Sequence, residues 1–195
     1  DKTLMNVFYG EPLIALREFP EAKFKLDATR IFPSASKEGI ERLVEFGKEL
    51  LKIQHGCMLA ITADAAIEAD RLDSQCIRVR PFPITPDLLS ALTKMDGALL
   101  IDPEGTCHAL GVILDGRASK LCDSSRGSRY NSAIRYVIGD NNIKAMAIVK
   151  SEDGMLDVIP DLHPKIRRSE VRNAFQILQA LAAQKEPDSE ELSRT

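Results

Sequence analysis

The sequence predicts an α/β fold with a mixed, largely antiparallel central sheet flanked by helices. Two apolar runs, at 56–62 and 97–101, have the length of a strand and no polar alternation, which is typical of strands covered on both faces. Turn-forming residues at 102–105 and 151–154 each separate two strand-like segments. These two predicted hairpins place antiparallel neighbours in the sheet, so a purely parallel arrangement is excluded.

Helices to cover the sheet are predicted from apolar residues that recur every three and four positions. Ser36 is a suitable N-cap for the first of them, whose apolar stripe runs from Ile40 to Leu51. Further helices are predicted at 87–95, 128–137 and 167–184. The remaining strands are predicted at 76–80, 106–114, 143–150 and 155–159, with the first as an edge strand.

The pattern along the chain predicts one folded domain over residues 36–184. Residues 1–35 mix short apolar pieces with three prolines and show no sustained period, so we expect a connector with one or two short strands. The interpretation of this connector as the end of an upstream domain stays open. Residues 185–195 are polar and are predicted to form a disordered tail.

Composition limits the classes of partner. The 195 residues are 44% hydrophobic, which is enough to bury a core. The 26 basic and 29 acidic residues give a formal charge of −3, so nucleic acid is not an expected partner. No apolar run approaches the ~20 residues that span a bilayer, and a membrane partner is not expected for this chain. We expect a cytoplasmic protein, although a parent protein with an upstream sensor or membrane segment stays open.

The four cysteines contain no Cys-x-x-Cys pair, which favours reduced thiols. A zinc site is a weak alternative, because cysteine in a strand is more often a small buried hydrophobe. Its ligands would be His55, Cys57, Cys107 and His108. His108 is more simply explained as a structural histidine.

Two segments thirty residues apart together predict a nucleotide site. In Asp96-Gly97-Ala98 a carboxylate stands beside a glycine at a strand edge, where a metal and a sugar hydroxyl can approach closely. Residues 126–133 place arginines, hydroxyls and free backbone N–H groups at a helix start, which favours phosphate. Each segment alone has a simple structural interpretation as a turn or an N-cap, so the prediction depends on both.

The order of these segments resembles the diadenylate cyclase domain over roughly residues 40–160. Asp96-Gly97-Ala98 matches the Asp-Gly-Ala motif of that family fully. Gly127-Ser128-Arg129-Tyr130-Asn131 matches its Gly-Thr-Arg-His-Arg motif in part, and Ser151-Glu152-Asp153 matches its Ser-Glu-Glu motif with one conservative change. The resemblance implies a diadenylate cyclase-like fold and a reaction that joins two ATP molecules into cyclic di-AMP with release of two pyrophosphates.

The resemblance also implies roles for particular residues. It assigns Asp96, Gly97, Ala98 and Arg129 to catalysis, and Asp96 and Glu152 to a divalent metal, Mg²⁺ or Mn²⁺. The residues that it assigns to ATP binding are Arg126, Gly127, Ser128, Arg129, Tyr130 and Asn131. Because one subunit holds one ATP, self-association into a face-to-face dimer or a higher oligomer is implied.

The departures from the family pattern leave alternatives open. Arg129-Tyr130-Asn131 stands where the family has Arg-His-Arg, and a lost charge-assisted hydrogen bond costs about 1.5–3 kcal/mol. Arg126, Arg117 and Lys120 are candidate replacements. The second hypothesis is a catalytically inactive sensor domain that binds adenine nucleotide, and the third is a different nucleotidyltransferase with a linear or mixed product. The preference for adenine over guanine comes from the resemblance alone.

Overall fold

The computed structural model of the chain describes residues 6–8, 11–13, 18–117, 120–139, 143–163, 171–173 and 175–179. The chain divides into two compact units, Asp1–Asp161 and Leu162–Thr195. In the second unit the residues 171–173 and 175–179 are helical, as predicted. The rest of the helix predicted at 167–184 and the tail predicted at 185–195 lie outside the described residues.

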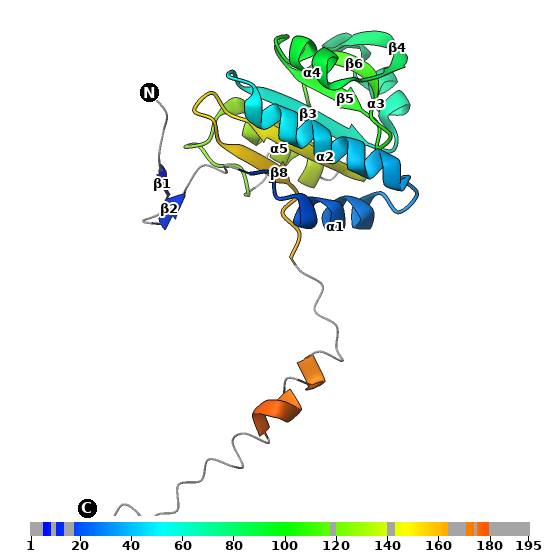
Figure 1. Ribbon diagram of the computed structural model, residues 1–195. Coiled ribbons are helices and arrows are strands. Elements are labelled where there is room, and N and C mark those ends of the chain that lie inside the picture. Colours follow the sequence, from blue (N-terminus) through cyan, green and yellow to red (C-terminus); the bar gives the residue numbers. More distant parts are fainter. Residues whose placement is uncertain are drawn as a thin grey trace, which may run out of the picture. The chain divides into compact units, whose positions relative to one another are not determined.

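A six-stranded sheet forms the centre of the first unit, in the order β4-β6-β5-β3-β7-β8 (Figure 1). Its strands are β3 (Cys57–Thr62), β4 (Ile77–Pro83), β5 (Ala98–Ile101), β6 (Thr106–Val112), β7 (Ala145–Lys150) and β8 (Leu156–Ile159). Only β3 and β5 pair in parallel, and the other four neighbouring pairs are antiparallel. This confirms the predicted mixed, largely antiparallel sheet, with both hairpins and with β4 at an edge.

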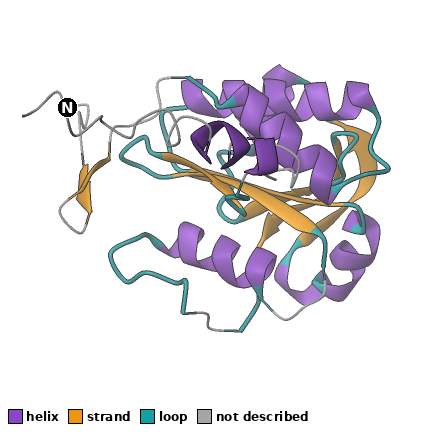
Figure 2. Ribbon diagram, turned by 90° about the horizontal axis from the view of Figure 1, so that it is seen from below, coloured by secondary structure: helices purple, strands orange, loops and turns teal. Residues whose placement is uncertain are grey.

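Helices cover both faces of this sheet (Figure 2). They are α1 (Glu21–Ile31), α2 (Lys37–Lys52), α3 (Ala65–Arg71), α4 (Pro86–Leu92) and α5 (Ser128–Ile138), with a 3₁₀ turn at Asp73–Gln75. Alternate residues of β3 point to opposite faces, so Leu59 packs with α1, α2 and α4 whereas Met58 packs with α3 and α5. All six residues of β3 are buried, as its continuous apolar run predicted.

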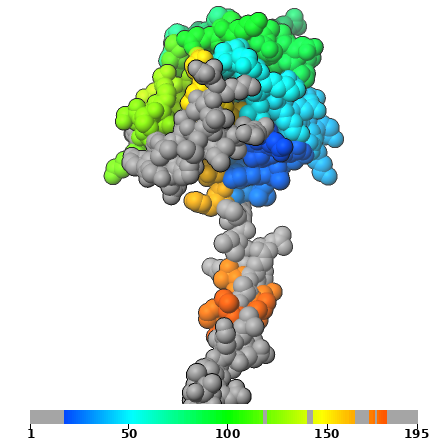
Figure 3. All heavy atoms as spheres, turned by 60° about the vertical axis from the view of Figure 1, so that its left-hand side comes forward, coloured from blue at the N-terminus to red at the C-terminus, as the bar shows by residue number. Residues whose placement is uncertain are grey.

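The first thirty-five residues contain more structure than the predicted connector. Two short strands, β1 (Asn6–Phe8) and β2 (Glu11–Leu13), form an antiparallel pair, as expected. Helix α1 was not predicted, yet Phe24 and Ala28 belong to the core and α1 packs on α2 (Figure 3). The sequence gives little sign of α1 because Pro20 at its N-cap supplies no side-chain cap and its buried face includes the charged residue Asp27.

Helix α3 was also absent from the prediction, which left the charged segment after β3 without regular structure. Its buried positions are Ala65, Glu68 and Ala69, and no side chain caps its start. Two alanines and a carboxylate do not form a recognisable apolar stripe. The helix therefore depends on tertiary contacts that the local sequence does not display.

Hydrogen bonds at the N-cap of helix α2 connect it to the β5–β6 hairpin. Ser36 Oγ accepts a hydrogen bond from the Gly39 N–H at 2.9 Å, as the predicted N-cap requires. Glu104, in the hairpin turn, accepts from the Ser36 N–H at 2.8 Å and also from its hydroxyl. Arg42 donates to the Glu104 carbonyl. These bonds fix the hairpin, and with it strand β5, against the helix.

The double role of Ser36 predicts an unusually costly cap substitution. Ser36→Ala removes both the bond to the helix and the bond to Glu104, and we expect the free energy of unfolding to fall by about 1–2 kcal/mol. Thr85, which accepts from the Leu88 N–H at 3.3 Å, is the matched control cap. Urea denaturation should show a larger loss for Ser36→Ala than for Thr85→Ala. Equal losses would mean that the contact with Glu104 adds no stability.

Candidate functional site

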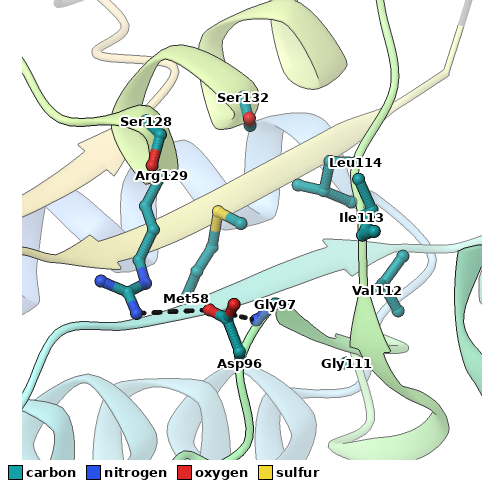
Figure 4. A pocket seen from close by; sticks show the side chains of 10 residues that line it. All are labelled: Met58, Asp96, Gly97, Gly111, Val112, Ile113, Leu114, Ser128, Arg129 and Ser132. Atoms are coloured by element: carbon teal, nitrogen blue, oxygen red, sulfur yellow. Dashed lines mark hydrogen bonds and ion pairs between the residues drawn. The ribbon is translucent and has the colours of Figure 1, made fainter.

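Asp96 and Gly97 line the same cavity as Ser128 and Arg129 (Figure 4). The cavity has a volume of about 260 Å³. One wall is the first turn of α5, and the facing wall is the end of β6 with the two residues after it. The other lining residues are Met58, Gly111, Val112, Ile113, Leu114 and Ser132. The two segments that the sequence singled out therefore meet at one place.

Close backbone packing forms the side of the cavity next to Asp96. Gly97 has φ +91°, and a Cβ there would lie 2.5 Å from the carbonyl carbon of Gly111. The Gly97 N–H donates to Asp96 Oδ1 at 3.0 Å, which orients the carboxylate at the rim. The Asp96 side chain is 97% exposed. Ala98 is fully buried in β5 and lines no cavity described for this site.

The Arg129 guanidinium lies between two carboxylates. Its Nη2 is 3.4 Å from Asp96 Oδ1, and its Nη1 is 3.1 Å from Glu152 Oε1. Gly56 makes room for this arrangement, because a Cβ there would lie 2.7 Å from Nη1 and 2.8 Å from Glu152 Oε1. Both carboxylates are largely exposed, so each ion pair contributes only about 0–1 kcal/mol and Arg129 can exchange partners readily.

A second, larger cavity of about 490 Å³ adjoins the first. Asp96 and Arg129 line both cavities, and Glu152 lines the second. The remaining residues around the second cavity are His55, Gly56, Thr93, Lys94 and Met95. None of these five was a predicted nucleotide-binding residue, although Lys94 lies only two residues before Asp96. The candidate replacements Arg117 and Lys120 line neither cavity.

Arg126 and Tyr130 anchor the start of α5 instead of facing the cavities. The Arg126 guanidinium lies over the Tyr130 ring, 4.1 Å from its centroid, and donates to Asp157 of β8. Burial raises the pKa of the Asp157 carboxyl, and the adjacent Arg126 opposes that shift. Neither Arg126 nor Tyr130 lines the two cavities.

Asn131 closes the loop that precedes α5. Its Oδ1 accepts from the Asp123 N–H at 2.8 Å, and its Nδ2 donates to the Asp123 carbonyl at 2.7 Å. Nδ2 also lies 3.0 Å from the Arg126 carbonyl and 3.4 Å from that of Gly127. The residue at which the chain departs from the family arginine thus holds Gly127 and the helix start in place.

A buried carboxylate holds the other end of α5. Tyr136, fully buried, donates its hydroxyl to Glu68 Oε2 at 3.0 Å, and burial raises the pKa of that hydroxyl. Arg71 donates to both oxygens of Glu68, at 2.9 and 2.8 Å, and also to both oxygens of Asp115. Because Asp115 follows Ile113 and Leu114, this network connects the two facing walls of the first cavity. No local sequence pattern indicates it.

The donor set fits a divalent cation only together with phosphate oxygens. Asp96 and Glu152 are two carboxylates at the rim, and among the described residues no group of three or more His, Cys, Asp or Glu side chains stands together. Magnesium is commonly bound through one or two carboxylates plus substrate phosphates, and two such carboxylates stand at this rim. A cation held by protein side chains alone is not supported.

The zinc alternative is wrong for the four residues considered. His55 Nε2 lies 3.0 Å from the Thr93 carbonyl, and His108 Nε2 lies 3.1 Å from Asp102. These contacts occupy the histidines separately, and the four candidate ligands, all of them within the described residues, form no common group. Burial raises the pKa values of the Cys57 and Cys107 thiols to about 11, as expected for small buried hydrophobes.

Comparison with known proteins gives no family. No protein-family description and no curated protein matches the chain. Among solved structures, a hypothetical membrane-spanning protein from Bacillus cereus is similar, with 17% identity and a TM-score of 0.49 over 71% of this chain and 69% of that chain. A similarity of this size carries no information about function. In the part of the chain that the structure describes, no helix is long and apolar enough to cross a bilayer.

The loop contacts of Asn131 give a prediction about stability. Asn131→Ala leaves the Asp123 N–H and the Arg126 carbonyl without their partner, and we expect the free energy of unfolding to fall by about 1–3 kcal/mol. Asn131→Asp keeps the acceptor but loses the donor, so it should also destabilise. Urea denaturation measures both changes. Unchanged stability in both variants would show that the side chain does not hold this loop.

Proposed function

We propose that this chain is a diadenylate cyclase, which joins two ATP molecules into cyclic di-AMP and releases two pyrophosphates. The observation that supports the proposal most strongly is the cavity shared by Asp96 and Gly97 on one side and by Ser128 and Arg129 on the other. These residues come from two of the three motifs that resemble the diadenylate cyclase family. Glu152, from the third motif, lies against Arg129 at the same rim.

The lining of the first cavity suits a nucleoside with a phosphate beside it. Ile113, which is 64% exposed, gives apolar surface for a flat base beside the nearly buried Met58 and Leu114. Ser128 and Arg129 supply a hydroxyl and a guanidinium for the α-phosphate. Gly127 at the N-cap has no side chain to cap the first turn of α5, so backbone N–H groups there are additional donors to an anion.

Asp96 and Glu152 are the residues that would hold a divalent metal, Mg²⁺ or Mn²⁺, between them and the phosphates. Such a cation would supply Lewis acidity, lowering the pKa of the attacking 3′-hydroxyl and neutralising phosphate charge. The exposure of both carboxylates leaves them reachable from the cavity.

The reaction needs positioning more than covalent help from the protein. The 3′-hydroxyl of each nucleotide gives its proton to solvent water, and its oxygen forms a bond to the α-phosphorus of the other nucleotide. The bond from that phosphorus to the pyrophosphate oxygen breaks, and pyrophosphate leaves. Arg129 and Ser128 stabilise the negative charge that develops on the α-phosphoryl oxygens and on the leaving group. Arg129 can turn to this role because its present ion pairs are exposed and weak.

Two subunits must meet face to face, because each nucleotide attacks the other. One copy of the cavity holds one nucleotide, and the second comes from a partner with its nucleotide antiparallel. An enzyme that uses ATP and has four cysteines as free thiols is expected in the cytoplasm.

An inactive adenine-nucleotide sensor is the second candidate. The observation that favours it is that, of Arg126, Arg129 and Asn131, only Arg129 lines the cavities. Arg126 contacts Asp157, and Asn131 holds the loop. Such a domain would bind ATP through the same cavity without turnover.

Product analysis tests these alternatives directly. The purified chain is incubated with ATP and Mg²⁺ or Mn²⁺, and the products are separated by chromatography and identified by mass. Cyclic di-AMP with pyrophosphate supports the cyclase. Tight ATP binding without product supports the sensor, and linear or mixed oligonucleotides would point to a different nucleotidyltransferase.

The role of Asp96 predicts a separation of activity from stability. Asp96→Asn keeps the size and the acceptor for the Gly97 N–H but removes the charge, so we expect turnover to be lost with an unchanged melting temperature. Asp87→Asn, an exposed change in the first turn of α4, is the control. A near-normal rate for Asp96→Asn would remove this carboxylate from the metal role.

The requirement for two subunits predicts how the rate depends on protein concentration. In the dilute range the rate per subunit should rise with concentration, because only dimers join two nucleotides. Initial rates are measured from well below to well above the dissociation constant found by analytical ultracentrifugation. A rate per subunit that stays constant far below that constant would contradict the face-to-face arrangement.

A further inference from the structure

We infer that the second cavity is an anion subsite, which takes the β- and γ-phosphates of the bound nucleotide and then the departing pyrophosphate, with Lys94 as its distinctive cation. This inference rests on the proposed function, since it concerns the same nucleotide. The cavity is large enough, at about 490 Å³, and it meets the first cavity at Asp96 and Arg129. A nucleotide with its α-phosphate at Arg129 would therefore extend into it.

The two cavities differ in chemistry in the way that the two ends of a nucleotide differ. Six of the ten residues around the first cavity are apolar or glycine, and they lie on β3, just before β5, at the end of β6 and directly after β6. Around the second cavity the side chains are polar or charged except for Met95 and Gly56. A nucleobase is stabilised by contact with the apolar lining of the first cavity, whereas a triphosphate tail is stabilised by cations and N–H donors. The tail is thus assigned to the second cavity.

Lys94 brings a second positive charge to the cavity, beside that of Arg129. Its ammonium makes no ion pair with another described residue, in contrast to Lys25, Lys48 and Lys52. The carboxylates of the same cavity, Asp96 and Glu152, already contact Arg129. A phosphate group is the kind of ligand that a lysine of this type binds as a point charge.

Several hydrogen bonds hold the backbone next to Lys94, so the point from which the lysine side chain extends is fixed. His55 Nε2 lies 3.0 Å from the Thr93 carbonyl, which joins the segment after α2 to the end of α4. Thr93 Oγ1 donates to the Ser90 carbonyl at 3.1 Å, and the Lys94 N–H donates to that of Ala91 at 3.3 Å. The backbone of Lys94 is therefore held beside the cavity.

The test compares ligands that differ only in phosphate. Dissociation constants for adenosine, ATP and inorganic pyrophosphate, each with Mg²⁺, are measured by calorimetry on the wild-type chain, Lys94→Gln and Lys94→Arg. Lys144→Gln is the matched control, because it makes the same charge change at the opposite end of β7. Lys144 precedes Ala145, whereas the other end of β7, Lys150, pairs with Cys57 next to the site. Both lysines are exposed, so neither substitution removes a buried side chain from the core.

We expect Lys94→Gln to weaken ATP and pyrophosphate about tenfold, which is about 1.4 kcal/mol, and to leave adenosine unchanged. Lys94→Arg should restore most of the affinity, and Lys144→Gln should match the wild-type chain. Unchanged ATP affinity in Lys94→Gln, or an equal loss for adenosine, would overturn the inference.

The outcome for the subsite is separable from the outcome for the cyclase. If the wild-type chain binds pyrophosphate through Lys94 but forms no cyclic di-AMP, the subsite stands and the proposed activity is wrong. If the wild-type chain forms cyclic di-AMP but Lys94→Gln binds ATP normally, the proposed activity stands and the subsite is wrong.

Discussion

The contact between the buried Glu68 carboxylate and the Tyr136 hydroxyl is the constraint on which the candidate site depends. A buried carboxylate is costly unless it is paired, and here Tyr136 and Arg71 satisfy it together. Because Arg71 also holds Asp115, the network sets the distance between α5 and the chain after β6. Those two segments are the facing walls of the first cavity. Groups that do not line the first cavity thus set the distance between its two walls.

The two residues that differ from the diadenylate cyclase pattern, Tyr130 and Asn131, make structural contacts in this chain. Asn131 closes the loop before α5, and Tyr130 packs under Arg126, which contacts Asp157. These contacts hold the helix start firmly but leave Arg129 as the guanidinium at the cavities. In the proposed reaction, the positive charge of Lys94 in the second cavity compensates for part of that difference. Preorganised hydrogen-bond donors can stabilise a phosphate at a site that has fewer cations.

The elements that the sequence predicted well are those whose signal is local. The apolar run of β3, the Ser36 cap of α2 and the turn residues of both hairpins act within a few residues of one another, and the structure contains all of them. Helices α1 and α3 lack caps and have short or charged buried faces, so nothing local marked them. Likewise β6 ends at Val112, two residues earlier than predicted, because Gly111 adopts φ +60° and the Ile113 N–H bonds to the Gln75 carbonyl.

The sequence by itself determined the class of fold and the two segments that meet at the site, because apolar periodicity, turn chemistry and helix-start residues are properties of short stretches of chain. Only the tertiary structure decided which side chains at those segments face the cavities. Arg129 faces them whereas Arg126 and Asn131 do not, and Lys94 enters from the end of α4. That choice depends on partners such as Asp157 and Asp123, whose distance in space cannot be deduced from their distance along the chain.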